Sequence, residues 1–358
     1  MPERTINFAS DNTSGVAPEV LTSISEAATS AAMPYGEDVF TKNLKRIANE
    51  IFEREVNIFP VVTGSAANAL ALATVAPPYG TIYCHEQSHI EEDECAAPEF
   101  YMGGGKLHLL AGAHGKITSK DLHSALDISS PAPAVHRSPP AVVSITQSTE
   151  IGSLYTMEEV SSISEVARSH GLPLHMDGAR FANAIVALGK SPAEVTWRSG
   201  VDILSLGATK NGAFAAEAVV FFNQDLVKDF EFRRKRGGHL LSKYRFLSAQ
   251  LLPYLESNRW LHMAGNANLR ASQLEKGLRD IKSISILYKV ETNMIFLEMP
   301  VEYVSHFYNN NCLFYSWGDG KDRVFARLVT SFDTTQEDVK AFLEIAHSVA
   351  ASSEGNIK

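Results

Sequence analysis

The chain has 358 residues, of which 45% are hydrophobic and 20% charged, the ordinary mixture of a folded globular protein. This length favours a large domain accompanied by a smaller one over a single hydrophobic core. A net charge of −9 argues against a general affinity for nucleic acid or anionic membranes.

Short apolar runs alternate with helical patterns over the first two-thirds of the chain, which predicts an α/β fold with a mainly parallel sheet and helices on both faces. The predicted strands are Thr81–Cys84, Ala141–Ile145, Leu172–Met176, Ile203–Leu206 and Ala218–Phe222. The predicted helices are Ser65–Val75, Met157–Ser169, Ala179–Leu188 and Asp225–Lys235. In such sheets, functional residues gather where the strands end.

The last third of the chain has a different pattern, which predicts a smaller α+β domain. It begins with a long helical stretch, Phe246–Ile281, interrupted at Pro253. Two strands and a final helix follow, at Thr292–Glu298, Val324–Val329 and Gln336–Ala350. We therefore expect a large domain of residues 1–245 and a small domain of residues 246–358. The Pro/Ser-rich segment Ser129–Pro140 indicates a surface loop.

The segment His175–Arg180, which reads HMDGAR, places Asp177 directly after a predicted buried strand. A carboxylate at a strand end, followed by glycine and a helix, is typical of an α/β active site. The alternative is that Asp177 only caps the helix that begins at Ala179. Taken alone, the segment leaves both interpretations open.

Lys210 also follows a predicted buried strand and has the small neighbours Gly207, Thr209 and Gly212. Lysine is seldom buried without a purpose, and burial would lower its pKa and leave an amine able to form an imine. The alternative is a solvated loop lysine. Asp177 precedes Lys210 by 33 residues, with one helix and one strand between them. Pyridoxal 5′-phosphate needs such a pair, a lysine for its aldehyde and an acid for its pyridine nitrogen.

Two further segments fit this cofactor. Gly64 and Ser65 begin an alanine-rich helix, whose free N–H groups and dipole favour a bound anion such as a phosphate. His89 follows the first predicted strand and is placed to stack on the pyridine ring, although an ordinary surface or core histidine is the alternative. The acidic run Glu91–Glu94 indicates a solvated helix start.

With these residues placed, the chain resembles the L-threonine aldolase family of fold-type-I pyridoxal phosphate enzymes, which are related to aromatic β-eliminating lyases. The similarity runs over essentially the whole length. It is carried by Ser10–Asn12, Tyr35–Asp38, Thr63–Asn68, Gln87–Ile90, His175–Asn183, Ser205, Thr209, Lys210 and Arg327–Thr330.

The resemblance implies a role for each matching residue. Lys210 would form the Schiff base, Asp177 would pair with the pyridine nitrogen, and His89 would stack on the ring. The phosphate would be held by Gly64, Ser65, Asn68 and Thr209, and by Lys243 or Arg245 from a basic Gly-Gly loop that often reaches across a subunit interface. The substrate carboxylate would be bound by Ser10, Arg180 and Arg327, whose planar guanidinium groups suit a carboxylate.

One departure from the family concerns substrate preference. Many relatives carry Glu-Asn-Thr-His after the strand that matches Ala141–Ile145, whereas this chain reads Gln147-Ser-Thr-Glu150. Glu150 thus stands where a histidine lies near the substrate β-hydroxyl. This variant resembles a subgroup that includes aldolases of phenylserine. His89, Glu150 and a bound water all remain candidates for the base.

We therefore expect a retro-aldol lyase of amino-acid metabolism that converts threonine, allo-threonine or phenylserine to glycine and an aldehyde. A pyridoxal phosphate-dependent β-eliminating lyase or aminotransferase, and a non-catalytic binding protein of the same fold, are the alternatives. No metal site is expected, because His175 and Asp177 lack further ligands. Family resemblance implies a homotetramer built as a dimer of dimers. We expect a cytoplasmic protein, because its three cysteines are scattered and neither a signal peptide nor a membrane span is visible.

Overall fold

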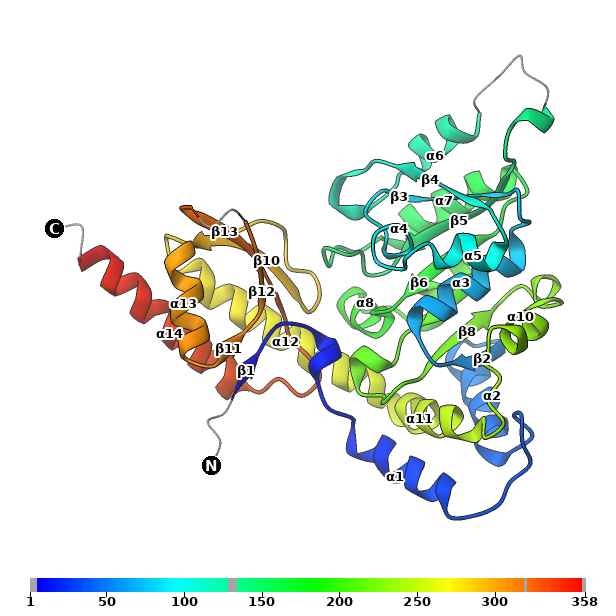
Figure 1. The fold of residues 1–358 in the computed structure, drawn as a ribbon, viewed down its shortest axis with the longest axis horizontal. Coiled ribbons are helices and arrows are strands. Elements are labelled where there is room, and N and C mark those ends of the chain that lie inside the picture. Colours follow the sequence, from blue (N-terminus) through cyan, green and yellow to red (C-terminus); the bar gives the residue numbers. More distant parts are fainter. Residues whose placement is uncertain (1–4, 128–133, 319–320, 356–358) are drawn as a thin grey trace.

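The computed structural model describes residues 5–127, 134–318 and 321–355, and a seven-stranded sheet forms the centre of its larger unit (Figure 1). The strand order is β2-β8-β7-β6-β5-β3-β4, and only β8 runs antiparallel to its neighbours. The strands are β2 (Asn57–Val61), β3 (Thr81–His85), β4 (Lys106–Leu110), β5 (Pro140–Thr146), β6 (Leu174–Gly178), β7 (Ile203–Leu206) and β8 (Glu217–Phe221). The prediction of a mainly parallel sheet is confirmed.

Helices cover both faces of this sheet, as the alternating pattern predicted. Along β8, Val220 packs in one core, whereas Val219 and Phe221 pack in another, because successive strand residues point to opposite faces. The first core contains buried residues of α2 (Val39–Ile51), α7 (Met157–Ser169), α8 (Phe181–Leu188) and α11 (Arg245–Leu255). The opposite face is covered by α3 (Gly64–Val75), α5 (Ala97–Met102) and α10 (Phe230–Arg236).

The smaller unit is built on a four-stranded antiparallel sheet in the order β12-β13-β10-β9. Its strands are β9 (Ser285–Ile286), β10 (Met294–Pro300), β12 (Tyr315–Trp317) and β13 (Arg323–Val329). Helices α12 (Arg259–Arg279), α13 (Val301–Asn309) and α14 (Gln336–Gly355) belong to this part of the chain, and α12 reaches it from the larger unit (Figure 1). No helix in the three described ranges is long and apolar enough to cross a membrane.

The amino-terminal strand β1 (Ile6–Asn7) belongs to the smaller unit rather than to the sheet that follows it in sequence. It pairs in parallel with β11 (Cys312–Leu313), and Ile6 and Phe8 are buried in the core of that unit. Conversely, Ala264 of α12 still packs in the core of the large sheet. Further along the same helix, Ala271 packs in the core of the smaller unit. The predicted boundary between the two domains, at residues 245 and 246, stays a prediction. From these two cores we propose instead a boundary within α12.

Two predicted helices differ from the observed ones. Pro253 lies inside α11, and the interruption comes later, where Ser257 and Asn258 adopt left-handed backbone conformations. The predicted helix Asp225–Lys235 is a 3₁₀ turn at Gln224–Leu226 followed by α10, because the Asn223 side chain closes a separate turn by accepting from the backbone N–H of Asp225. In the predicted loop Ser129–Pro140, residues 129–133 lie outside the described residues, and Pro140 already begins β5.

Candidate active site

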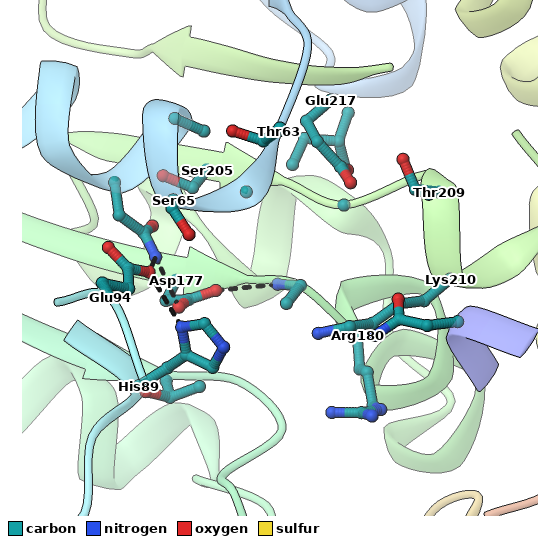
Figure 2. A pocket seen from close by; sticks show the side chains of 18 of the residues that line it. Thr63, Ser65, His89, Glu94, Asp177, Arg180, Ser205, Thr209, Lys210 and Glu217 are labelled. Carbon is teal, nitrogen blue, oxygen red and sulfur yellow. Dashed lines mark hydrogen bonds and ion pairs between the residues drawn. The ribbon is translucent and has the colours of Figure 1, made fainter. Parts of the chain in front are cut away.

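A cavity of about 340 Å³ opens where the parallel strands end, beside the first turn of α3. It brings together most of the side chains that the sequence singled out, namely Gly64, Ser65, Asn68, His89, Glu150, Asp177, Arg180, Thr209 and Lys210. Ser10, Lys243, Arg245 and Arg327 do not line it. Figure 2 shows His89, Glu94 and Asp177 close together, with Lys210 and Arg180 further along the cavity.

Asp177 is the next-to-last residue of β6, and its side chain is held by two hydrogen bonds. One carboxylate oxygen accepts from the backbone N–H of Ala179 at 2.9 Å, and the other accepts from the Asn68 amide at 2.8 Å. Asp177 is not the cap of the following helix, because α8 begins at Phe181 without a side-chain cap. Its carboxylate is therefore fixed at the cavity wall for another purpose.

His175, on the same strand, is buried away from any metal-binding role. Its two ring nitrogens each lie 2.9 Å from a serine hydroxyl, of Ser144 and Ser205. Burial lowers the pKa of His175 to about 4, so the imidazole is neutral at physiological pH. Both nitrogens are thus engaged, and His175 links β6 to its two neighbouring strands, β5 and β7.

Glu94 corrects the expectation that the acidic run Glu91–Glu94 is solvated. The helix at the start of this run, α4, spans only His89–Glu92, and the chain beyond it turns the Glu94 side chain inward, where the residue is 5% exposed. One Glu94 oxygen contacts Nδ1 of His89 at 2.9 Å. This hydrogen bond raises the pKa of His89 and fixes the orientation of its ring, while burial raises the pKa of Glu94.

Asn68, which the family resemblance assigned to the phosphate, lies instead between two carboxylates. Its amide nitrogen donates to Glu94 and to Asp177, at 2.8 Å in each case. Both amide hydrogens are thereby used. Asn68 thus connects His89, through Glu94, to Asp177, and we propose that it positions Asp177 rather than binding an anion.

Lys210 lies in a short 3₁₀ turn, Thr209–Asn211, directly after β7. Its amine makes no hydrogen bond or ion pair with any residue that the structure describes. Burial and then the neighbouring Arg180 lower its pKa from the ordinary lysine value. Lys210 is therefore not a solvated loop lysine, and it lines the cavity with an unpaired amine.

Two residues that the sequence interpretation did not assign keep Lys210 in place. A Cβ on Gly207 would lie 2.4 Å from the carbonyl oxygen of Ala179, so only glycine allows the ends of β6 and β7 to approach so closely. Glu217 on β8 accepts from the backbone N–H of Ala208 at 2.6 Å, and burial raises the pKa of Glu217 to about 7. The only available signal for Glu217 was an acidic residue next to an apolar run.

The amino terminus of α3 has free donors that face the cavity. The Thr63 side chain accepts from the backbone N–H of Ala66, and the Thr63 carbonyl accepts from Ala67. The N–H groups of Gly64 and Ser65, in the first turn, have no partner among the described residues. A Cβ on Gly64 would meet nothing within 4 Å, which leaves open space for a ligand against this backbone. This arrangement suits a phosphate.

Arg180 is oriented by a buried carboxylate that the sequence interpretation left without a role. Its Nε and Nη2 donate to the two oxygens of Asp11, at 2.7 and 2.9 Å. Although burial alone would raise the pKa of Asp11, Arg180 holds that pKa below its ordinary value. The pair uses one edge of the guanidinium and leaves the Nη1 side free for a second carboxylate.

Arg327 and Ser10 lie close to this pair but outside the cavity lining. The Arg327 guanidinium lies over the rings of Tyr315 and Trp317, and its buried Nε has no partner. Burial and then the charge of Arg180 lower the pKa of Arg327. Ser10 accepts from the backbone N–H of Asn12, and its hydroxyl hydrogen is not used by that bond.

Glu150 lines the cavity and contacts the first residue of α4. One of its oxygens accepts from the backbone N–H of His89 at 3.0 Å and from the Thr146 hydroxyl at 2.9 Å. The other oxygen is buried without a partner, as is the Ser148 hydroxyl beside it. Burial raises the pKa of Glu150 to about 7.

These residues fit pyridoxal phosphate. The cavity offers an unpaired amine for its aldehyde, a fixed carboxylate for its ring nitrogen, an oriented imidazole for its ring face and free backbone N–H groups for its phosphate. Buried oxygens of Asn68, Glu94, Ser148 and Glu150 have no partner among the described residues, so the cavity is polar enough to require a ligand or water.

Lys243 and Arg245 were expected to contact the phosphate, but neither reaches the cavity of its own chain. Lys243 is exposed, and Arg245 donates to the carbonyl oxygens of Ala27 and Ser30. A contact from these residues would therefore have to be made in a second copy of the chain.

Comparison with known proteins agrees with this geometry. Residues 7–301 match the model of a family described as beta-eliminating lyase. Low specificity L-threonine aldolases of Pseudomonas aeruginosa and of a second Pseudomonas strain are 39% and 38% identical to the chain, each over 98% of it and over 98% and 99% of their own lengths. A solved threonine aldolase structure from Leishmania major superimposes with a TM-score of 0.89 at 26% identity, covering 96% of this chain and 99% of the other. The chain belongs to the beta-eliminating lyase family and has the fold of the fold-type-I enzymes.

Proposed function

We propose that this protein is a pyridoxal phosphate-dependent aldolase that cleaves β-hydroxy-α-amino acids such as threonine, allo-threonine and phenylserine to glycine and an aldehyde. The observation that carries the proposal is the cavity itself, which combines the free Lys210 amine with the doubly hydrogen-bonded Asp177 carboxylate. The names of the relatives, which cover nearly the whole chain, support the same reaction.

The cofactor would be held by residues at fixed backbone positions. Lys210 would hold the aldehyde carbon, Asp177 would keep the pyridine nitrogen protonated, and Gly64 and Ser65 would bind the phosphate. When bound, pyridoxal phosphate withdraws electrons from the substrate bond that breaks at Cα. The cofactor site therefore sets the class of chemistry, and the remaining residues select the bond.

Two arginines are suited to hold the substrate carboxylate. Arg180 keeps one edge of its guanidinium free after pairing with Asp11, and Arg327 has an unpaired Nε. Each of these neighbouring cations disfavours the other, and a carboxylate between them would relieve that repulsion. We assign them, with the Ser10 hydroxyl, to the carboxylate, so that the Cα–Cβ bond is oriented for cleavage.

A proton must leave the β-hydroxyl as the Cα–Cβ bond breaks. We assign its acceptance to Glu150, because one Glu150 oxygen is buried at the cavity without a partner and its pKa of about 7 suits a base at neutral pH. His89 is committed to Glu94 through Nδ1, which favours its role as the group that lies against the cofactor ring.

A product assay tests the reaction. Purified protein with pyridoxal phosphate should convert phenylserine and threonine to glycine and the matching aldehyde. β-Elimination is the second candidate, because the matched family carries that name. Formation of a keto acid and ammonia in place of glycine and an aldehyde would favour it and contradict the aldolase proposal. Turnover only when a keto acid is added would instead identify an aminotransferase.

We also propose a cytoplasmic homotetramer arranged as a dimer of dimers. Large aromatic side chains support association, since Phe100, Phe214 and Phe232 are 78%, 65% and 76% exposed in the isolated chain. The position of Lys243 outside its own cavity supports a contribution to the cavity of a second copy. The free thiols of Cys84, Cys95 and Cys312 support a reducing compartment. Sedimentation velocity should give the mass of four chains, and a monomer would contradict the assembly.

A further inference from the structure

A cluster of metal-ligating side chains lies outside the cavity, between α6 (Ser119–Leu126) and the end of α7. His123 is on α6, Asp127 follows four residues later, and His170 comes directly after α7. Nε2 of His123 lies 3.0 Å from one Asp127 oxygen, and Nε2 of His170 lies 3.1 Å from the other. The three ligand atoms all lie within 4.8 Å of one another.

The His170 ring is oriented so that one of its nitrogens faces a backbone carbonyl and the other faces Asp127. Its Nδ1 lies 3.0 Å from the carbonyl oxygen of Val166, and because a carbonyl can only accept, Nδ1 carries the hydrogen. In a neutral ring, Nε2 then presents a lone pair to the Asp127 carboxylate. Either a proton on Nε2 or a metal ion between the two groups satisfies both of them, and the second imidazole, of His123, lies within reach of the same carboxylate. Histidines that bind metals commonly have this arrangement, with the other ring nitrogen donating to a backbone carbonyl.

We propose that His123, Asp127 and His170 bind a divalent transition-metal ion of the zinc class, with water completing its coordination. Two imidazoles and one carboxylate are ligands that Zn²⁺ favours, whereas Ca²⁺ and Mg²⁺ prefer oxygen ligands alone. A tetrahedral ion with bonds of about 2.0 Å needs ligand atoms about 3.3 Å apart. Whichever Asp127 oxygen binds the ion, one imidazole nitrogen already lies close to this distance from it, because Nε2 of His123 and Nε2 of His170 contact different oxygens at 3.0 and 3.1 Å.

Small side-chain movements would complete the site. The side chains of His123 and Asp127 are 57% and 53% exposed and so are free to adjust, whereas that of His170 is 25% exposed and held by Val166. A bound ion would connect α6 to the end of α7, two helices that already pack together. His170 precedes β6, whereas Asp177 is near the far end of that strand, so the ion would stabilise the fold without touching the catalytic cavity.

The proposal is tested by zinc binding to the metal-free holoenzyme, measured by equilibrium dialysis for the wild type and for H123Q and H170Q. H347Q is the matched control, because His347 is an exposed histidine on α14. The wild type and H347Q should bind one more Zn²⁺ per chain than H123Q or H170Q, or bind it at least about tenfold more tightly. Zn²⁺, but not Ca²⁺, should raise the melting temperature of the wild type and H347Q alone.

Equal zinc uptake by the wild type, H123Q and H170Q would place the metal elsewhere, for example at the cofactor phosphate, and would overturn the proposal. Equal stabilisation of H123Q and the wild type by Zn²⁺ would do the same. H123Q decides the matter if H170Q fails to fold, because the exposed His123 side chain is free of the core. Activity of H123Q at 25 °C should match the wild type, since the site is structural.

Discussion

The groups that we assign to the cofactor and to the substrate differ in how completely the chain satisfies their carboxylate oxygens. On the side that we assign to the cofactor, both oxygens of Asp177 accept hydrogen bonds, and α3 begins with a capped turn. On the side that we assign to the substrate, oxygens of Glu150 and Ser148 are buried without partners, and Arg327 has an unpaired Nε. Burial also raises the pKa of Glu150 to about 7.

This difference indicates that one set of residues holds the cofactor and the other binds the substrate. A fixed carboxylate and a fixed anion site can hold one cofactor through many turnovers at little reorganisation cost. The substrate side keeps unsatisfied groups, and a substrate with a carboxylate and a β-hydroxyl would supply their partners. Variants on the first side should therefore abolish the chemistry, whereas variants on the second should change selectivity, pH dependence or substrate affinity.

The largest effect is expected for Lys210→Ala. Removing the amine that holds the cofactor should lower kcat by at least about a thousandfold and eliminate the visible absorption band of the lysine-bound cofactor. Lys190→Ala, at an exposed lysine that pairs with Glu194, should leave both unchanged. Persistence of the band in the Lys210 variant would refute the assignment of the cofactor side.

Asp177→Asn should have the next largest effect. The substitution keeps the side-chain shape but removes the charge that keeps the pyridine nitrogen protonated, so kcat should fall by about 10²–10³. Asp202→Asn is the control, because Asp202 also accepts a backbone hydrogen bond, from Leu174, but lies outside the cavity lining. Steady-state kinetics with phenylserine would compare them, and equal losses would show that Asp177 has only a structural role.

Glu150→Gln tests the substrate side through pH. If Glu150 accepts the β-hydroxyl proton, its carboxyl must be ionised, so wild-type activity should rise as pH increases through about 7. Gln cannot ionise, so this rise should disappear and kcat should fall by about a hundredfold. His89→Asn should keep the rise. Loss of the rise in the His89 variant alone would identify His89 as the proton acceptor.

Arg327→Lys should have the smallest effect. Lysine keeps the charge but lacks the planar fork, so KM for threonine should increase by about tenfold while kcat changes less. Arg323→Lys is matched on the same strand, since Arg323 pairs with Glu298 at 3.3 Å. A similar KM for both variants would remove Arg327 from the carboxylate site.

The sequence predicted the residues at strand ends better than the residues buried by long-range packing, for a physical reason. Asp177 and Lys210 follow apolar strands, and strand ends are recognisable from local pattern. Glu94 and Glu217 are buried by long-range packing that no local pattern reports, so Glu94 was expected in solvent and Glu217 was not noticed. The strands β2 and β4 were also missed, because β2 contains Pro60 and the edge strand β4 is partly exposed.

The pairing of β1 with β11 has a consequence for the order of folding. Ile6 is synthesised long before its strand partner Cys312, which follows roughly 300 residues later in the chain. The core of the smaller unit can therefore close only after β11 has been synthesised. Asp11, which orients Arg180, lies just beyond this strand, so the strand that precedes Asp11 is fixed only after β11 has been synthesised. A nascent chain stalled before β11 should consequently remain sensitive to proteases at its amino-terminal segment.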